Sequence, residues 1–466
     1  MTGVVSRASF MLELLEDLTG QKPPFPSPEP AERALAQFAG DGIGHSQLNE
    51  LLLLLGYDRV SPNFFQYLVD GGVVYKPNAS IGSLEQLHRA TQQFQLVALL
   101  FYGNVKFAFK SLSNNPDGLR AALSLLAPRA EKEFEERHHP IQPVDPISPE
   151  DTYYLGYLIA EELKKRLEAD PTDRVALEQE KKRKELIERG RRNHEAYLTS
   201  DHLDVYVATS MRERHEYLLV GEFARAIFES DPLRRMGIRW FDPTQAYCLD
   251  RIDKGLAEAL MLKRARCTLY LAQETDTLGK DSELASTLAQ GKPVIAFVPT
   301  GDESYCDNLL KMLRSVRDGR TEKELILAQL QAFDSGLAWK DAKVRSWLTD
   351  LSAAPLEEMK HRCYEVVLEQ SNRRARILKE SHPLGVQVQV SNGVANGVIV
   401  ARSIAECAEL IKRVLTRTLT FDVEESVTPI GKYLFLREQL TKSIFRVVTG
   451  DMMLTNTFWN YYLRTT

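Results

Sequence analysis

Hydroxyl, cationic and carboxylate side chains follow three apolar segments in the middle of the chain. They are Thr209, Ser210 and Arg212, then Asp242 and Thr244, and then Asp276, Lys280, Asp281, Ser282 and Glu283. Guanidinium and ammonium groups bind phosphate, carboxylates bind hydroxyls, and the amides at a helix N-terminus bind anions. Together these residue types suit a phosphorylated sugar.

Glu283 has two interpretations. It stands near the start of a predicted helix at 281–291, where an acid in the first turn, behind a cap at Asp281 or Ser282, favours the helix by roughly 0.3–1 kcal/mol. The other interpretation is an acid that acts on a ligand. The polar loop before Glu283 and the wholly apolar segment at 293–299 favour the second, provided that the leucines of the helix turn inward.

The elements that must position these side chains alternate along the chain. Segments rich in apolar and β-branched residues predict strands at 203–209, 238–243, 267–273 and 293–299. The segments between them predict helices at 216–237, 250–266 and 281–291. This alternation predicts a parallel sheet with helices on both faces, and ligands bind such a sheet at the carboxyl ends of its strands.

Helical patterns on both sides of the α/β segment predict a multidomain chain. Residues 1–145 predict an all-α N-terminal region, and a proline-rich stretch at 138–151 marks its end. The predicted parts that follow are a charged helical connector at 146–200, the α/β domain at 201–300, and a mostly helical region, α+β at its end, at 301–466. In this last region, alternation around "SNG" predicts a β-hairpin at 385–403, and a helix and a strand follow it.

Charge and cysteine usage narrow the class of protein. The net charge is −5, from 59 basic and 64 acidic residues, which gives no support to broad binding of nucleic acid. The charged segment 174–198 fits a basic nucleic-acid helix or a solvated helix with ion pairs, and its interleaved glutamates favour the latter. Five scattered cysteines without a CxxC pair argue against structural zinc and predict reduced thiols. With no signal peptide and no apolar run of membrane length, we expect a cytoplasmic protein without membrane contact.

Residues 203–299 resemble a TIR domain and, more distantly, the nucleoside 2-deoxyribosyltransferases. The resemblance rests on "LDVYVATSMRE", "MGIRWFDP", "DRIDKGLAEALMLKRARCTLYLA" and "DSELASTLAQGKPVIAFV". It implies a flavodoxin-like, TIR-type parallel-sheet domain. It also implies cleavage of an N-glycosidic bond, foremost the nicotinamide–ribose bond of NAD, which would be a substrate rather than a cofactor. No metal is required.

The resemblance assigns roles residue by residue. Glu283 would be the catalytic acid. Thr209, Ser210 and Arg212 would line the cleft from the loop after the first strand, and Asp242 and Thr244 from the loop after the second. The usual tryptophan–cysteine pair before the glutamate is absent, and Asp281 and Ser282 stand there instead.

Three functions follow from the resemblance. The first is an NAD-cleaving effector of bacterial antiviral defence that is activated by self-association, with the helical flanks and the aromatic segment 458–463 contacting a second copy or a partner protein. The second is a nucleoside or nucleotide N-glycosidase or deoxyribosyltransferase. The third is a nucleotide-sensing or scaffold domain without catalysis.

Overall fold

The structure is a computed structural model, and it leaves parts of the chain undescribed. The described residues are 44–47, 49, 62–70, 74–81, 130–132, 134, 144–199, 203–274, 277–289, 292–316, 319–380, 394–395, 398–428 and 431–447. Helix α4 (Pro62–Asp70) belongs to the expected N-terminal helical region. Most of that region, Asp276 and the aromatic segment 458–463 lie outside the described residues.

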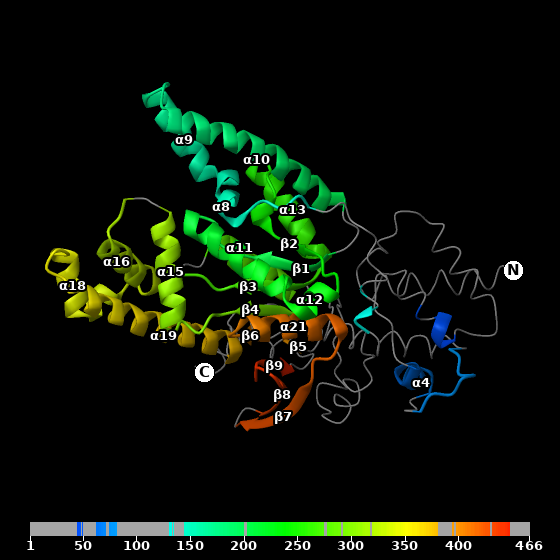
Figure 1. The fold of residues 1–466 in the computed structure, drawn as a ribbon. Helices are drawn as coiled ribbons and strands as arrows, with labels where there is room; N and C mark the ends of the chain where they lie inside the picture. The colour runs from blue at the N-terminus through cyan, green and yellow to red at the C-terminus, as the bar shows by residue number, and fades with distance from the viewer. Residues whose placement is uncertain are drawn as a thin grey trace, which may run out of the picture.

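A five-stranded, all-parallel sheet forms the centre of the described chain (Figure 1). Its strand order is β2-β1-β3-β4-β6. The strands are β1 (Leu203–Ala208), β2 (Trp240–Phe241), β3 (Ala265–Leu271), β4 (Val294–Phe297) and β6 (Val398–Ala401). The prediction of a parallel α/β sheet is therefore confirmed, and all four expected strands are present.

Both faces of the sheet are covered, because its side chains alternate between two cores. Val205 and Val207 point to one core, which α11 (Arg214–Phe228), α12 (Asp231–Arg235) and α21 (Ile404–Thr416) complete. Tyr206 and Ala208 point to the other. The helices that contribute to this second core are α10 (Arg174–Thr199), α13 (Arg251–Arg264), α14 (Leu278–Ala289) and α19 (Leu356–Glu380).

The expected hairpin at 385–403 is wrong for the described part of that segment. β6 pairs with β4 in parallel, with Ile399 opposite Ile295, and β5 (Val394–Ala395) pairs with β9 (Ile444–Val447) instead. All four residues of β6 are buried, and such a continuous apolar run is typical of a parallel strand covered on both faces. The central sheet therefore takes its fifth strand from beyond residue 300.

A second sheet combines β5 with three strands that follow α21. It has the order β5-β9-β8-β7, and it is antiparallel. Its longer strands are β7 (Phe421–Thr428), β8 (Gly431–Glu438) and β9 (Ile444–Val447). The expected succession of a helix and a strand at the end of the chain is confirmed by α21 and β7.

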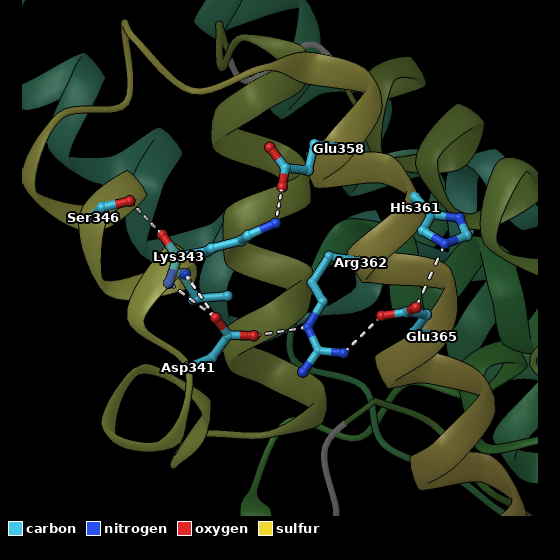
Figure 2. Close-up of polar contacts among 8 residues, drawn as sticks. Asp341, Lys343, Ser346, Glu358, His361, Arg362 and Glu365 are labelled. Carbon is cyan, nitrogen blue, oxygen red and sulfur yellow. Dashed lines mark hydrogen bonds and ion pairs between the residues drawn. The ribbon is translucent and has the colours of Figure 1, made fainter.

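Five helices between residues 303 and 380 lie in the chain between β4 and β6. They are α15 (Glu303–Ser315), α16 (Glu322–Phe333), α17 (Leu337–Lys340), α18 (Ala342–Thr349) and α19, and they share their own apolar core. Figure 2 shows how α18 is tied to α19: Asp341 accepts a hydrogen bond from Nε of Arg362 at 2.9 Å, and Lys343 pairs with Glu358. The far end of α19 packs on the central sheet through Ala375 and Leu378.

The segment before the sheet is helical, as expected. It comprises α8 (Pro149–Thr152), the 3-10 turn η1 (Tyr153–Leu155), α9 (Tyr157–Ala169) and α10. Pairs such as Arg191 with Glu188, three residues apart, fit the solvated interpretation of the charged segment. Among the residues that the structure describes, no helix combines the length and the apolar character that a membrane span needs.

Candidate functional site

The carboxyl ends of β1 and β3 lie side by side, and the chain leaves them toward opposite faces. After β1 it enters α11, which packs on one core, and after β3 it enters α14, which packs on the other. Open α/β sheets bind ligands at the carboxyl ends of strands where the chain diverges in this way. This edge is the candidate site.

Thr209 and Ser210 are brought together there by Gln273. Oε1 of Gln273 accepts hydrogen bonds from the Thr209 hydroxyl at 2.9 Å and from the Ser210 amide at 2.6 Å. Its Nε2 donates to the Ser210 carbonyl at 3.0 Å. All three residues are buried. These bonds fix the two loops to each other, so Thr209 and Ser210 shape the edge of the site.

Arg212 has an exposed side chain at the start of α11. Its main-chain amide donates to Oε2 of Glu216 at 2.6 Å, beside a reciprocal capping arrangement between Glu213 and Glu216. The backbone here is therefore fixed, while the guanidinium is accessible to an anion.

Asp242 and Thr244 contact each other in the turn after β2. Oδ1 of Asp242 accepts hydrogen bonds from the Thr244 amide at 2.9 Å and from its hydroxyl at 2.7 Å. Both residues are buried, and burial raises the pKa of Asp242 despite these bonds. This arrangement caps a short 3-10 turn, η2 (Pro243–Gln245).

The expected position of Glu283 in its helix needs correction. α14 begins at Leu278, so Asp281 is in the first turn and Glu283 in the second. Ser282 does not cap the helix. It is exposed, and its hydroxyl donates to the Leu278 carbonyl at 2.6 Å, a bond within the helix. The leucines of α14 do turn inward, since Leu284 and Leu288 are buried.

Glu283 is half-buried and faces the sheet. Its Oε1 accepts a hydrogen bond from the hydroxyl of Tyr206 at 2.7 Å, and Tyr206 is completely buried in β1. Burial raises the pKa of Glu283 to about 8. The Tyr206 hydroxyl, Lys254 and Lys280 oppose this rise, whereas the nearby charge of Glu258 adds to it. The carboxyl is therefore largely protonated at neutral pH.

Lys280 and Asp281 lie on the β3 side of α14. The ammonium group of Lys280 is buried, donates to the Leu271 carbonyl at 3.2 Å, and lies 4.7 Å from the centre of the Tyr270 ring. Oδ1 of Asp281 accepts from the Tyr270 hydroxyl at 3.1 Å. Lys280 thus holds the end of β3, and Asp281 contacts β3 whereas Glu283 contacts β1.

A cavity of about 440 Å³ opens beside Asp281 of α14, at the ends of β3 and β4. Of the nine site residues named for the described chain, Asp281 lines it, and Glu283 with the other seven does not. The polar residues that line it are Tyr270, Gln273, Glu274, Asp281, Tyr305, Gln370, Ser371, Arg373 and Arg374. Gln273 and Glu274 lie two and three positions after the end of β3, so the rule that selected the predicted residues applies to them too. The residues from α15 and α19 carry no such signal.

Glu274 pairs with His215 of α11 beneath the loops. Nε2 of His215 lies 3.3 Å from each carboxylate oxygen, and both residues are buried. Burial by itself lowers the pKa of His215, but the hydrogen bond and the charge of Glu274 outweigh it, so this pKa is raised. The Glu274 carboxylate thus stabilises the protonated form of His215.

Neither a search for metal ligands nor comparison with known proteins assigns a role to any further residue of the site. Within the described ranges, no three histidine, cysteine, aspartate or glutamate side chains gather in a way that would hold a metal ion. No protein-family model, no curated protein and no solved structure matches the chain.

Proposed function

We propose that the protein is a TIR-like NAD⁺ nucleosidase that cleaves the nicotinamide–ribose bond. The observation that carries the proposal is the carboxyl group of Glu283, 2.7 Å from the Tyr206 hydroxyl and close to the edge where β1 and β3 diverge. The strand order β2-β1-β3-β4-β6 supports it, because it repeats the flavodoxin-like order, in which ligands bind at this edge. A role in antiviral defence and activation by self-association rest on the sequence resemblance.

The proposed chemistry needs one carboxylate. The C1′–N bond breaks and its electron pair moves to the positively charged nicotinamide ring, which leaves as neutral nicotinamide. The ribosyl centre becomes cationic, and a water molecule adds its oxygen to C1′ and releases a proton. The positive ring beside Glu283 favours the ionised carboxyl, so substrate binding would lower its pKa and prepare it to stabilise the ribosyl cation.

Release of nicotinamide tests this proposal. The purified protein is incubated with NAD⁺ at low and high protein concentration, and nicotinamide is measured by chromatography. Glu283→Gln should reduce the rate at least 100-fold, as expected for loss of a transition-state charge. Glu185→Gln, at an exposed position of α10, is the control and should stay within twofold of the wild type. Absence of nicotinamide at every protein concentration would refute the proposal.

A binding role without turnover is the second candidate. The observation that favours it is that Glu283 does not line the cavity at the ends of β3 and β4. In that case the domain would bind a nucleotide without consuming it. Saturable binding of NAD⁺ that is recovered intact, with the same affinity in Glu283→Gln, would support this alternative over catalysis.

A further inference from the structure

The cavity beside α14 is built by parts of the chain that are distant in sequence. Its lining comes from β3, from the residues that follow β3 and β4, and from α14, α15, α16 and α19. The helices α15 to α19 form a helical segment at 303–380. Figure 1 shows α19 running from the other helices of this segment to the central sheet, which brings the segment to the strand ends. The volume of about 440 Å³ falls in the range of small-molecule sites, and apolar side chains such as Val298, Phe333 and Val367 line part of it.

Glu274 contributes a largely buried carboxylate to the lining of this cavity. It is 8% exposed, and Nε2 of His215 lies 3.3 Å from each of its oxygens. A carboxylate has more lone pairs than one imidazole N–H can satisfy. A ligand that donates a hydroxyl or amine hydrogen would give it a further hydrogen bond. Asp281, which lines the same cavity, offers a second carboxylate.

Two arginines also line the cavity. Arg373 and Arg374 come from α19, and a guanidinium nitrogen of Arg374 donates to the main-chain carbonyl of Gln273. Tyr305 lines the same cavity and interacts electrostatically with Glu274 and Arg374. Burial raises its pKa, the charge of Glu274 raises it further, and Arg374 lowers it. The cavity therefore presents hydrogen-bond acceptors, aromatic rings and guanidinium groups within one small volume.

We infer that this cavity binds a ribonucleotide. The carboxylates of Glu274 and Asp281 accept hydrogen bonds from the ribose hydroxyls, Arg373 contacts the phosphate, and Tyr305 with Phe333 flanks the base. Nucleotides bind at the carboxyl ends of parallel strands, and this cavity lies at the ends of β3 and β4. The inference goes beyond the proposed function, because it assigns a separate site that Glu283 does not line.

Calorimetric titration with AMP tests the inference, with adenosine and inorganic phosphate as the comparison ligands. Wild-type protein should bind AMP at least tenfold more tightly than either of them. Arg373→Glu should weaken AMP binding tenfold or more. Arg376→Glu makes the same charge change at an exposed position of α19 outside the cavity and should stay within twofold of the wild type.

The result of the AMP titration does not depend on whether the protein cleaves NAD⁺. Glu283→Gln should bind AMP like the wild type, so AMP binding without nicotinamide release would keep this inference and refute the proposed function. Equal affinity of Arg373→Glu and Arg376→Glu, equal affinity for adenosine and AMP, or no saturable AMP binding would overturn the inference.

Discussion

The carboxyl group of Glu283 lies against the buried hydroxyl of Tyr206, and its pKa is raised from 4.5 to about 8, chiefly by burial. The folded chain thus holds this proton more tightly than the unfolded chain. A group of this kind contributes stability that is fully present below pH 4.5, where both states are protonated, and that is lost as the pH rises to about 8. Glu283 therefore couples the stability of the fold to pH in the neutral range.

Glu283→Gln removes this titration, since the glutamine keeps an acceptor for Tyr206 and carries no charge. The melting temperature of the variant should equal that of the wild type at pH 5 and exceed it by roughly 2–4 °C at pH 8.5. Such a shift corresponds to about 1 kcal/mol, because water screens a half-exposed carboxyl. Glu185→Gln should show no such dependence on pH. If the difference in melting temperature between Glu283→Gln and the wild type is the same at pH 5 and pH 8.5, Glu283 does not couple the stability of the fold to pH.

The sequence predicted which residues lie at the carboxyl edge of the sheet better than it predicted the partners of their side chains. The strand-end rule selected Thr209, Ser210 and Asp281, and all three lie at the carboxyl edge of the sheet. The partners of their side chains follow from tertiary packing, which no local pattern contains. The bond from Asp242 to Thr244 is an exception, because a short acidic side chain often caps the residue two positions on.

At the scale of elements, α18 depends on one side chain at its start. Asp341 accepts hydrogen bonds from the amides of Lys343 at 2.9 Å and Val344 at 3.3 Å, and it also pairs with Arg362 (Figure 2). Asp341→Ala removes both functions and should cost about 1–2 kcal/mol, the usual effect of losing a helix cap. Hydrogen exchange of residues 342–349, read by mass spectrometry, should become faster.

Asp341→Asn separates the cap from the charge. Asparagine caps helices as well as aspartate does, so this variant should keep most of the protection of α18 and lose only the ion pair. If Asp341→Asn and Asp341→Ala accelerate exchange equally, the ion pair with Arg362 is the dominant contribution, and the capping argument is wrong.

Element positions were easier to predict than element partners. The four strands between 203 and 299 and the helices that separate them follow from local patterns of apolar residues. The partner of β6 does not, because about one hundred residues separate it from β4. A turn signal nearby favoured a hairpin, and burial of the strand on both faces decided otherwise.

At the scale of the whole described molecule, the helices before the sheet are joined to it by polar and close apolar contacts. Asn193 of α10 accepts from the Asp145 amide at 2.8 Å and donates to the carbonyl of Gln245 at 3.0 Å. Gly221 of α11 lets Pro149 approach the helix, since a Cβ built on this glycine would lie 2.7 Å from Cβ of the proline. The packing of α8 on α11 therefore requires glycine at this position.

Two glycine-to-alanine changes should consequently have opposite effects on the free energy of unfolding. In an exposed helix interior, alanine is more favourable than glycine by roughly 0.5–1 kcal/mol. Gly255→Ala in α13 should give this gain, because no atom lies within 4 Å of the added methyl group. Gly221→Ala should instead lose about 1–3 kcal/mol, because the clash with Pro149 forces α8 and α11 apart. Urea unfolding of the two variants, together with limited proteolysis between 144 and 200, measures both effects. A Gly221→Ala variant as stable as Gly255→Ala, with unchanged proteolysis, would show that α8 does not pack on α11 in solution.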